Sequence, residues 1–149
     1  MPNTNAASRS SGDDSSYRSP QEIDAVVRHP NPHLRANLVA DPHTPLTAHQ
    51  VALLVDDPSP SVQANLIRSG RDLTAAQVRR LGSASSELVR IALVNSRHRL
   101  PPSVIARLVD DPYDRVRSVV ARSTRPLTKA QREKLAADAH WDVRRSLAS

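Results

Sequence analysis

A spacing of 27 residues organises most of the chain and limits the folds that it can adopt. Three columns of apolar residues keep this register: Leu46, Leu73, Leu100 and Leu127; Leu54, Leu81, Leu108 and Leu135; and Val62, Val89, Val116 and Val143. A fixed period of roughly 20–50 residues is typical of stacked supersecondary units, because no single unit can bury its apolar face alone. The spacing therefore predicts a repeat protein.

Most repeats carry the signals of two helices. The capping-box pattern, a threonine followed three residues later by glutamine, occurs at Thr47, Thr74 and Thr128. Apolar residues follow at helical spacing, as in Val51, Leu54 and Val55. The sequence Asp56-Asp57-Pro58 then ends the first helix, because proline cannot continue its hydrogen bonds. Ser59-Pro60 marks the start of a second, shorter helix.

We therefore predict an all-α protein, an α-solenoid of about five two-helix repeats with a short second helix. The expected repeats are 19–45, 46–72, 73–99, 100–126 and 127–149, which together form one domain, 19–149. In the first repeat, the same columns place Ile23, Val26, Leu34 and Leu38 in the core. Residues 1–18 are rich in Asn, Ser and Gly, and we expect a disordered tail without a secretory signal.

Repeat three departs from the pattern at the end of its first helix. Gly82 replaces the core residue that is Val55 or Val109 elsewhere, and Ser83-Ala84-Ser85-Ser86 replaces the Asp-Pro turn. Glycine inside a helix costs about 0.5–1 kcal/mol relative to alanine. Two interpretations are open: a local bend or opening point, or a close approach of two helices.

Two segments resemble a known family. His29-Pro30-Asn31-Pro32-His33-Leu34-Arg35 and Asp111-Pro112-Tyr113-Asp114-Arg115-Val116-Arg117 are similar to variant leucine-rich repeats, which are relatives of the HEAT class. The resemblance covers about residues 19–149. It implies helix pairs stacked into a right-handed superhelix, with second helices that are partly 3₁₀ in some members. The founding type also has a cysteine-rich iron–sulfur segment, which is not implied here because the chain has no cysteine.

One group of arginines has a structural interpretation. Arg35, Arg90, Arg117 and Arg144 directly follow the third apolar column. Asp111 and Asp138 precede Arg117 and Arg144 by six residues. We interpret this group as a charge-assisted hydrogen-bond ladder, with Asp111 as the partner of Arg117, rather than as ligand contacts. A further column of Arg80, Arg107 and Lys134 is expected on an exposed, solvated face.

A second group of arginines is a candidate site for an anionic partner. Its members follow the second helices: Arg68, Arg71, Arg97, Arg99, Arg122 and Arg125. They line one edge of the predicted stack, and aspartates of the turns line the opposite edge. Each group could simply complement the helix dipoles, by about 0.3–1 kcal/mol per charge. Alternatively, the basic edge and the net charge of +6 attract a polyanion or an acidic partner.

Tyr113 and Trp141 are candidate hot-spot residues for binding a protein, since they lie on the acidic edge in consecutive repeats, near His140. The alternative, which we favour, is that Trp141 covers the open end of the last repeat. With three aromatic residues in the chain, base stacking is disfavoured, which leaves sequence-independent phosphate contacts as the route to nucleic acid.

Other classes of function are disfavoured. Prolines separate His29 from His33, and the chain has no thiolate, so we expect no metal or cofactor. The chain has no nucleophile elbow and no glycine-rich phosphate loop, which predicts that it is not an enzyme. Its longest apolar run, Val51–Val55, is too short for a membrane span. Lack of cysteine favours the cytoplasm. We predict a non-enzymatic module that binds another protein, with sequence-independent nucleic-acid binding as the alternative.

Overall fold

The computed structural model describes residues 18–149, so the predicted tail of residues 1–18 lies, apart from Arg18, outside the described residues. The described range contains ten helices: α1 (Pro20–Val27), α2 (Pro32–Ala40), α3 (Ala48–Val55), α4 (Pro60–Arg68), α5 (Ala75–Gly82), α6 (Glu87–Val94), α7 (Pro102–Val109), α8 (Asp114–Arg122), α9 (Lys129–Ala136) and α10 (Trp141–Ala148). Residues 18–149 contain no strand, which confirms the predicted all-α class.

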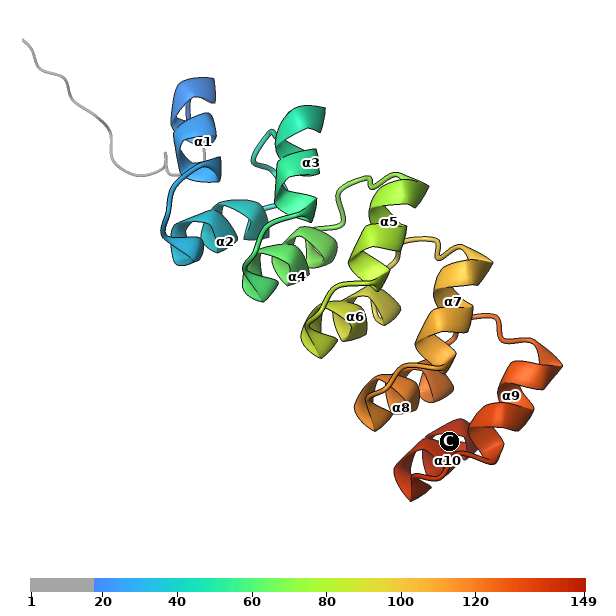
Figure 1. Cartoon of the computed structure of the whole chain (residues 1–149). Coiled ribbons are helices and arrows are strands. Elements are labelled where there is room, and N and C mark those ends of the chain that lie inside the picture. The colour runs from blue at the N-terminus through green and yellow to red at the C-terminus, as the bar shows by residue number, and fades with distance from the viewer. Residues whose placement is uncertain (1–17) are drawn as a thin grey trace, which may run out of the picture.

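The helices form two rows, as Figure 1 shows. The first helices of the pairs, α1, α3, α5, α7 and α9, make one row, and the second helices make the other. Each second helix packs against the next one, and each first helix packs against both its own partner and the following first helix. This arrangement fits a helical repeat protein with five helix pairs. None of the described helices has the length and apolar character needed to cross a membrane.

The predicted helix starts are present. Thr47, Thr74 and Thr128 each accept a hydrogen bond from the backbone N–H of a glutamine, whose side chain accepts one from the threonine N–H in return. At Ser19 the first of these two bonds forms, from the Glu22 N–H at 3.1 Å. These capping contacts satisfy backbone donors that would otherwise lack a partner at the start of each helix.

The prediction that the second helix is shorter than the first is wrong for this chain, and the partly 3₁₀ second helix that the resemblance implies for some family members does not occur in residues 18–149. The second helices have eight or nine residues, whereas every first helix has eight. All ten are α-helical in the described range. Interior second helices are in contact with neighbours on both sides, and buried residues therefore extend over their length, from Val62 to Ile67 in α4. Burial on two sides favours the complete α-helix.

The core contains the columns that the period predicts. Leu54, Leu81, Leu108 and Leu135 are buried, and so are Val62, Val89, Val116 and Val143. In the first repeat, Ile23 and Leu38 are buried and Val26 is partly buried, but Leu34 is 42% exposed. Leu34 stands at the position of the fully buried Val62, yet no described repeat precedes α2 to cover it. The prediction of a buried Leu34 is therefore wrong, because the preceding repeat supplies the cover for this column.

Gly82 marks a close approach of two helices. A Cβ atom added to Gly82 would lie 3.0 Å from Cγ1 of Val104 in α7 and 3.6 Å from Cδ2 of Leu93 in α6. Its φ is not in the left-handed region, so space rather than backbone conformation favours glycine. Of the two interpretations left open by the sequence, the structure supports the close approach.

Candidate functional site

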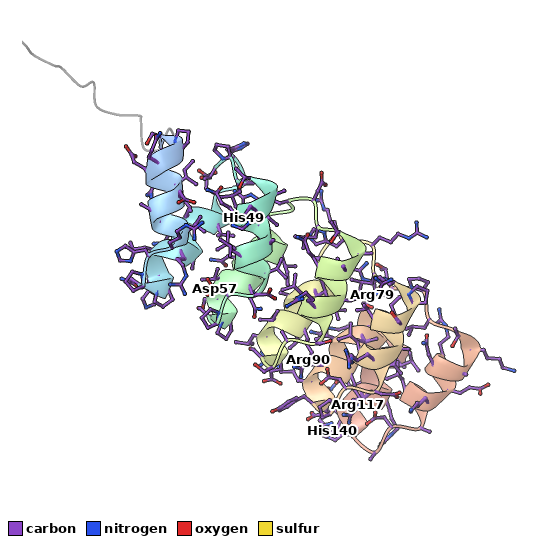
Figure 2. All side chains as sticks on the ribbon, turned by 45° about the horizontal axis from the view of Figure 1, so that its top comes forward. His49, Asp57, Arg79, Arg90, Arg117 and His140 are labelled. Atoms are coloured by element: carbon purple, nitrogen blue, oxygen red, sulfur yellow. The ribbon has the colours of Figure 1, made fainter. Side chains whose placement is uncertain are left out.

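Three arginine–aspartate pairs connect consecutive repeats. Arg35 binds Asp57 through two hydrogen bonds of 2.8 and 2.9 Å. The equivalent bonds are 2.6 and 3.0 Å for Arg90 with Asp111, and 2.7 and 3.1 Å for Arg117 with Asp138. Figure 2 shows Asp57, Arg90 and Arg117 following one another along the same side of the stack. The paired fork geometry is the strong form of this interaction, and it holds adjacent repeats in register.

The expected pairing within one repeat is wrong in one respect. Arg117 donates to the backbone carbonyl of Asp111, six residues earlier, while its carboxylate partner is Asp138 of the next repeat. The carboxylate of Asp111 instead binds Arg90. Each arginine therefore makes one bond to its own turn and two to the next repeat. The six-residue spacing identified the carbonyl contact, but spacing within a repeat could not identify the partner in the next.

Arg71 and Arg125 do not belong to a free basic edge, contrary to the prediction. Arg71 donates to the backbone carbonyls of Val39, Asp41 and Thr44 at 2.6–2.8 Å. Burial lowers the pKa of this guanidinium from its ordinary value, although arginine stays protonated in proteins. These carbonyls belong to the end of α2 and the connection that follows it, so Arg71 caps a helix C-terminus of the preceding repeat.

Arg125 makes the same kind of contact between repeats three and four, two junctions further along the stack. Its guanidinium donates to the carbonyls of Leu93, Val94, Ser96 and His98 at 2.6–3.1 Å, at the end of α6. Burial also lowers its pKa from the ordinary value. The connecting segment between repeats runs past the C-terminus of the preceding second helix, and this places both arginines inside the stack. Their role is structural.

The other four arginines of the predicted edge are exposed: Arg68, Arg97, Arg99 and Arg122. Three of them, Arg68, Arg97 and Arg99, line a groove of about 780 Å³ between the C-terminal ends of α4 and α6. Within the described residues, none of the four forms an ion pair. The structure therefore gathers half of the six predicted residues into one basic groove.

Tyr113 and Trp141 lie at the N-terminal ends of α8 and α10, where they are 50% and 57% exposed. Trp141 is the first residue of α10, whereas the buried residues of that helix are Val143 and Ser146. The favoured prediction that Trp141 covers the open end of the last repeat is therefore wrong. Arginine side chains lie over both rings, Arg90 at 5.5 Å from the Tyr113 centroid and Arg145 at 5.9 Å from that of Trp141.

Leu88 is a third exposed apolar residue at the N-terminal end of a second helix, and the sequence analysis did not identify it. It is the second residue of α6 and is 50% exposed, beside the fully buried Val89. The signal was available in the sequence, because a leucine directly before the buried valine column faces away from the core. We call Leu88, Tyr113 and Trp141 the apolar edge. The three residues occupy the N-terminal ends of three consecutive second helices.

Arg80, Arg107 and Lys134, which we expected only to face solvent, form a second set of contacts between repeats. Arg80 binds Asp56 at 2.8 and 3.0 Å, and Lys134 forms an ion pair with Asp110. Arg107, the equivalent residue between them, donates to the hydroxyl of Ser83, because repeat three has serine where repeats two and four have aspartate. Exposed pairs of this kind contribute little to stability, roughly 0–1 kcal/mol. Arg107 consequently keeps a positive charge that no carboxylate in the described residues balances.

The described residues contain no group of three or more histidine, cysteine, aspartate or glutamate residues arranged to hold a metal ion. Comparisons of the chain with protein families, curated proteins and solved structures found no match. The fold and its surfaces define the class: a helical protein of repeat-like architecture, with a basic groove on one edge and an apolar edge on the other.

Proposed function

We propose that this chain is a non-enzymatic module that binds another protein, built as a solenoid related to the variant leucine-rich repeats. The observation that carries the proposal is the apolar edge. Three large apolar side chains, Leu88, Tyr113 and Trp141, are each at least half exposed at the N-terminal ends of consecutive second helices. Tyrosine and tryptophan are enriched in binding hot spots, because they bury a large area when a partner covers them.

The surroundings of the apolar edge suit a protein partner. Arg90 and Arg145 lie against the aromatic rings, and His140 stacks on Trp141 with ring centroids 6.4 Å apart. Contacts of this kind hold the rings in fixed orientations, which reduces the conformational entropy lost on binding. The absence of cysteine from the sequence supports a cytoplasmic location for this activity.

Affinity capture tests the proposal. The tagged full chain would be incubated with an extract of its source cells, with and without nuclease, and compared with a Tyr113→Ala/Trp141→Ala variant. We expect proteins that the wild type retains after nuclease treatment and that the variant loses. Arg132→Gln is the matched surface control, because Arg132 is exposed on α9 and away from this edge. Equal capture by both chains would contradict a binding role for the apolar edge.

Sequence-independent nucleic-acid binding is the second candidate, and the basic groove favours it. Three arginines without ion-pair partners in the described residues, Arg68, Arg97 and Arg99, line one groove. If they contact phosphates, affinity for a labelled duplex should fall with salt, by a log–log slope of about 0.9 per phosphate neutralised. Replacing all three by glutamine should reduce that slope in fluorescence anisotropy. Undetectable binding at low salt would exclude this function.

A further inference from the structure

Small residues hollow out the turn of repeat three. In repeats two and four the turn reads Val55-Asp56-Asp57-Pro58 and Val109-Asp110-Asp111-Pro112, whereas repeat three has Gly82-Ser83-Ala84-Ser85. Two adjoining depressions, of about 620 and 660 Å³, share Gly82, Ser83 and Arg107 in their walls. We call the two together the Gly82 groove. Ser83, Ala84 and Ser85 are smaller than the two aspartates and the proline that they replace, which leaves the turn hollow, whereas Val104 fills the space beside Gly82.

The depression nearer the apolar edge exposes more apolar than polar surface, although Arg107 and Asp110, whose carboxylate is paired with Lys134, also line it. Ala84 in the turn after α5, Ala106 in α7 and Tyr113 before α8 contribute to its lining. The buried Arg90–Asp111 pair forms part of the wall, and each of its charges is already satisfied by the other. An apolar side chain from a partner could enter this pocket without leaving a buried charge unpaired.

The depression on the other side of Ser83 is basic. Arg79 and Arg107 line this depression. Asp56 also lines it, but its carboxylate is already bound by Arg80. Arg79 is exposed and forms no ion pair within residues 18–149, and Arg107 binds only the uncharged Ser83 side chain there. At the equivalent positions, Arg80 and Lys134 are both paired with aspartates. The groove therefore offers two positive charges to an anionic group.

We propose that the Gly82 groove binds an extended segment of a partner protein that carries an apolar side chain close to a carboxylate. The apolar side chain occupies the pocket between Ala84, Ala106 and Tyr113, and the carboxylate binds Arg107, replacing the Ser83 hydroxyl. This inference rests on the proposed function as a protein-binding module and names the chemistry of its partner. Charge complementarity selects the acidic residue, and the adjoining apolar pocket selects a peptide over a phosphate backbone.

A phage library that displays random twelve-residue peptides is the probe. Selection on the full-length chain should enrich peptides in which a leucine, methionine or aromatic residue lies within a few positions of aspartate or glutamate. The best peptide would then be synthesised with a fluorophore and titrated by fluorescence polarisation. Ala106→Leu, which fills the pocket, and Arg107→Gln, which removes the charge, should each weaken binding by about tenfold or more.

Matched controls come from the repeats themselves. Ala52 is the equivalent of Ala106 two repeats earlier, is exposed on α3 and lines neither depression, so Ala52→Leu should leave binding unchanged. Arg132→Gln controls for loss of one positive charge on a first helix. Circular dichroism melting tests whether each variant is folded. Comparison of Ala106→Leu with Ala52→Leu separates the effect of filling the pocket from the effect of a larger side chain on the surface.

The outcomes separate this inference from the proposed function. Peptides that lose affinity with Tyr113→Ala/Trp141→Ala but not with Ala106→Leu or Arg107→Gln would overturn the groove and leave protein binding at the apolar edge intact. Enriched peptides without acidic residues would also overturn the groove. Selection that yields no peptide above the background of uncoated wells would overturn the groove as a peptide site, while affinity capture from extract would still test the proposed function on its own.

Discussion

Gln63 and Ala84, at the junction between repeats two and three, stand at the two positions that an arginine and an aspartate occupy at each of the other three junctions. Gln63 donates instead to the carbonyl of Val55 at 2.8 Å, within its own repeat. Both partners of the pair are replaced together, so neither an arginine nor an aspartate is left buried without its counterion. A buried charge that loses its partner destabilises a protein strongly, so replacing both residues is tolerated better than replacing either one alone.

The same joint, between repeats two and three, also lacks the arginine that caps the preceding second helix. His98 occupies the position of Arg71 and Arg125, and its Nε2 atom lies 3.3 Å from the carbonyl oxygen of Ile67. One imidazole contact replaces three or four guanidinium bonds. The junction between repeats two and three therefore lacks both the arginine–aspartate pair and the arginine cap that are present at the junctions on either side.

Restoring the missing pair should strengthen this joint. Gln63→Arg and Ala84→Asp are each expected to be neutral or destabilising, since each alone introduces a charge without its partner. Together they should show a favourable coupling of about 1–3 kcal/mol in a double-mutant cycle measured by urea unfolding. Gln63→Lys with Ala84→Asp is the control, because an ammonium group cannot form the two-pronged pair. Simple additivity would contradict the equivalence of this position to the other joints.

Arg125 and Arg122 should respond differently to the same substitution, although Arg122 is the last residue of α8 and Arg125 lies only three residues later. Arg125→Gln removes hydrogen bonds from a charged group to four buried or partly buried carbonyls, which typically costs about 1.5–3 kcal/mol for each such bond before relaxation. Arg122→Gln alters an exposed side chain and should change the unfolding free energy by about 0.5 kcal/mol or less. Thermal and urea unfolding compare the two. Equal effects would contradict the capping role.

Asp138 should make stability fall in acid. Its hydrogen bond with Arg117 lowers the pKa of the folded carboxyl below the ordinary value. The unfolded chain, with an Asp pKa of about 3.9, therefore binds more protons as the pH falls. The stabilisation is fully present above that pKa and is lost as the pH drops through the lower folded pKa.

The measurement is the unfolding free energy of wild type and Asp138→Asn between neutral pH and pH 3. Asp138→Asn should be less stable at neutral pH, and the difference should narrow as the pH falls below about 4. The difference in unfolding free energy between wild type and Arg117→Gln should also narrow as the pH falls, since this variant lacks the group that lowers the pKa of Asp138. A difference that stays constant with pH would show that Asp138 contributes no pH-dependent stability through this pair.

Leu108 and Leu135 test whether stability accumulates along the stack. Both side chains are buried, so burial alone predicts similar costs for replacing either with alanine. Leu108→Ala should cost about 2–5 kcal/mol, because it empties the core between two neighbouring repeats. Leu135→Ala should cost less, because α9 belongs to the last pair, which has a neighbour on one side. Urea unfolding that gives equal or reversed costs would contradict a stack whose end is less coupled.

Much of the fold could be predicted from local pattern. The threonine capping boxes, the proline turns and the buried leucine and valine columns are all present, because each depends on spacing within one repeat. The period alone also indicated that neighbours must cover each apolar face. Predictions that used the pattern at the ends of the stack were less successful, since Leu34 and Trp141 depend on neighbours that the period does not specify.

The sequence by itself determined which segments are helical, where most of the helices begin, and which repeating columns form the core. Only the tertiary structure decided what the polar side chains do. Arg71 and Arg125 looked like Arg68 and Arg122 in sequence, yet the first two cap the preceding repeat and the other two are exposed. Apolar burial follows periodicity because it is non-directional, whereas a hydrogen bond depends on the distance and angle between groups from different repeats, which spacing along one chain does not fix.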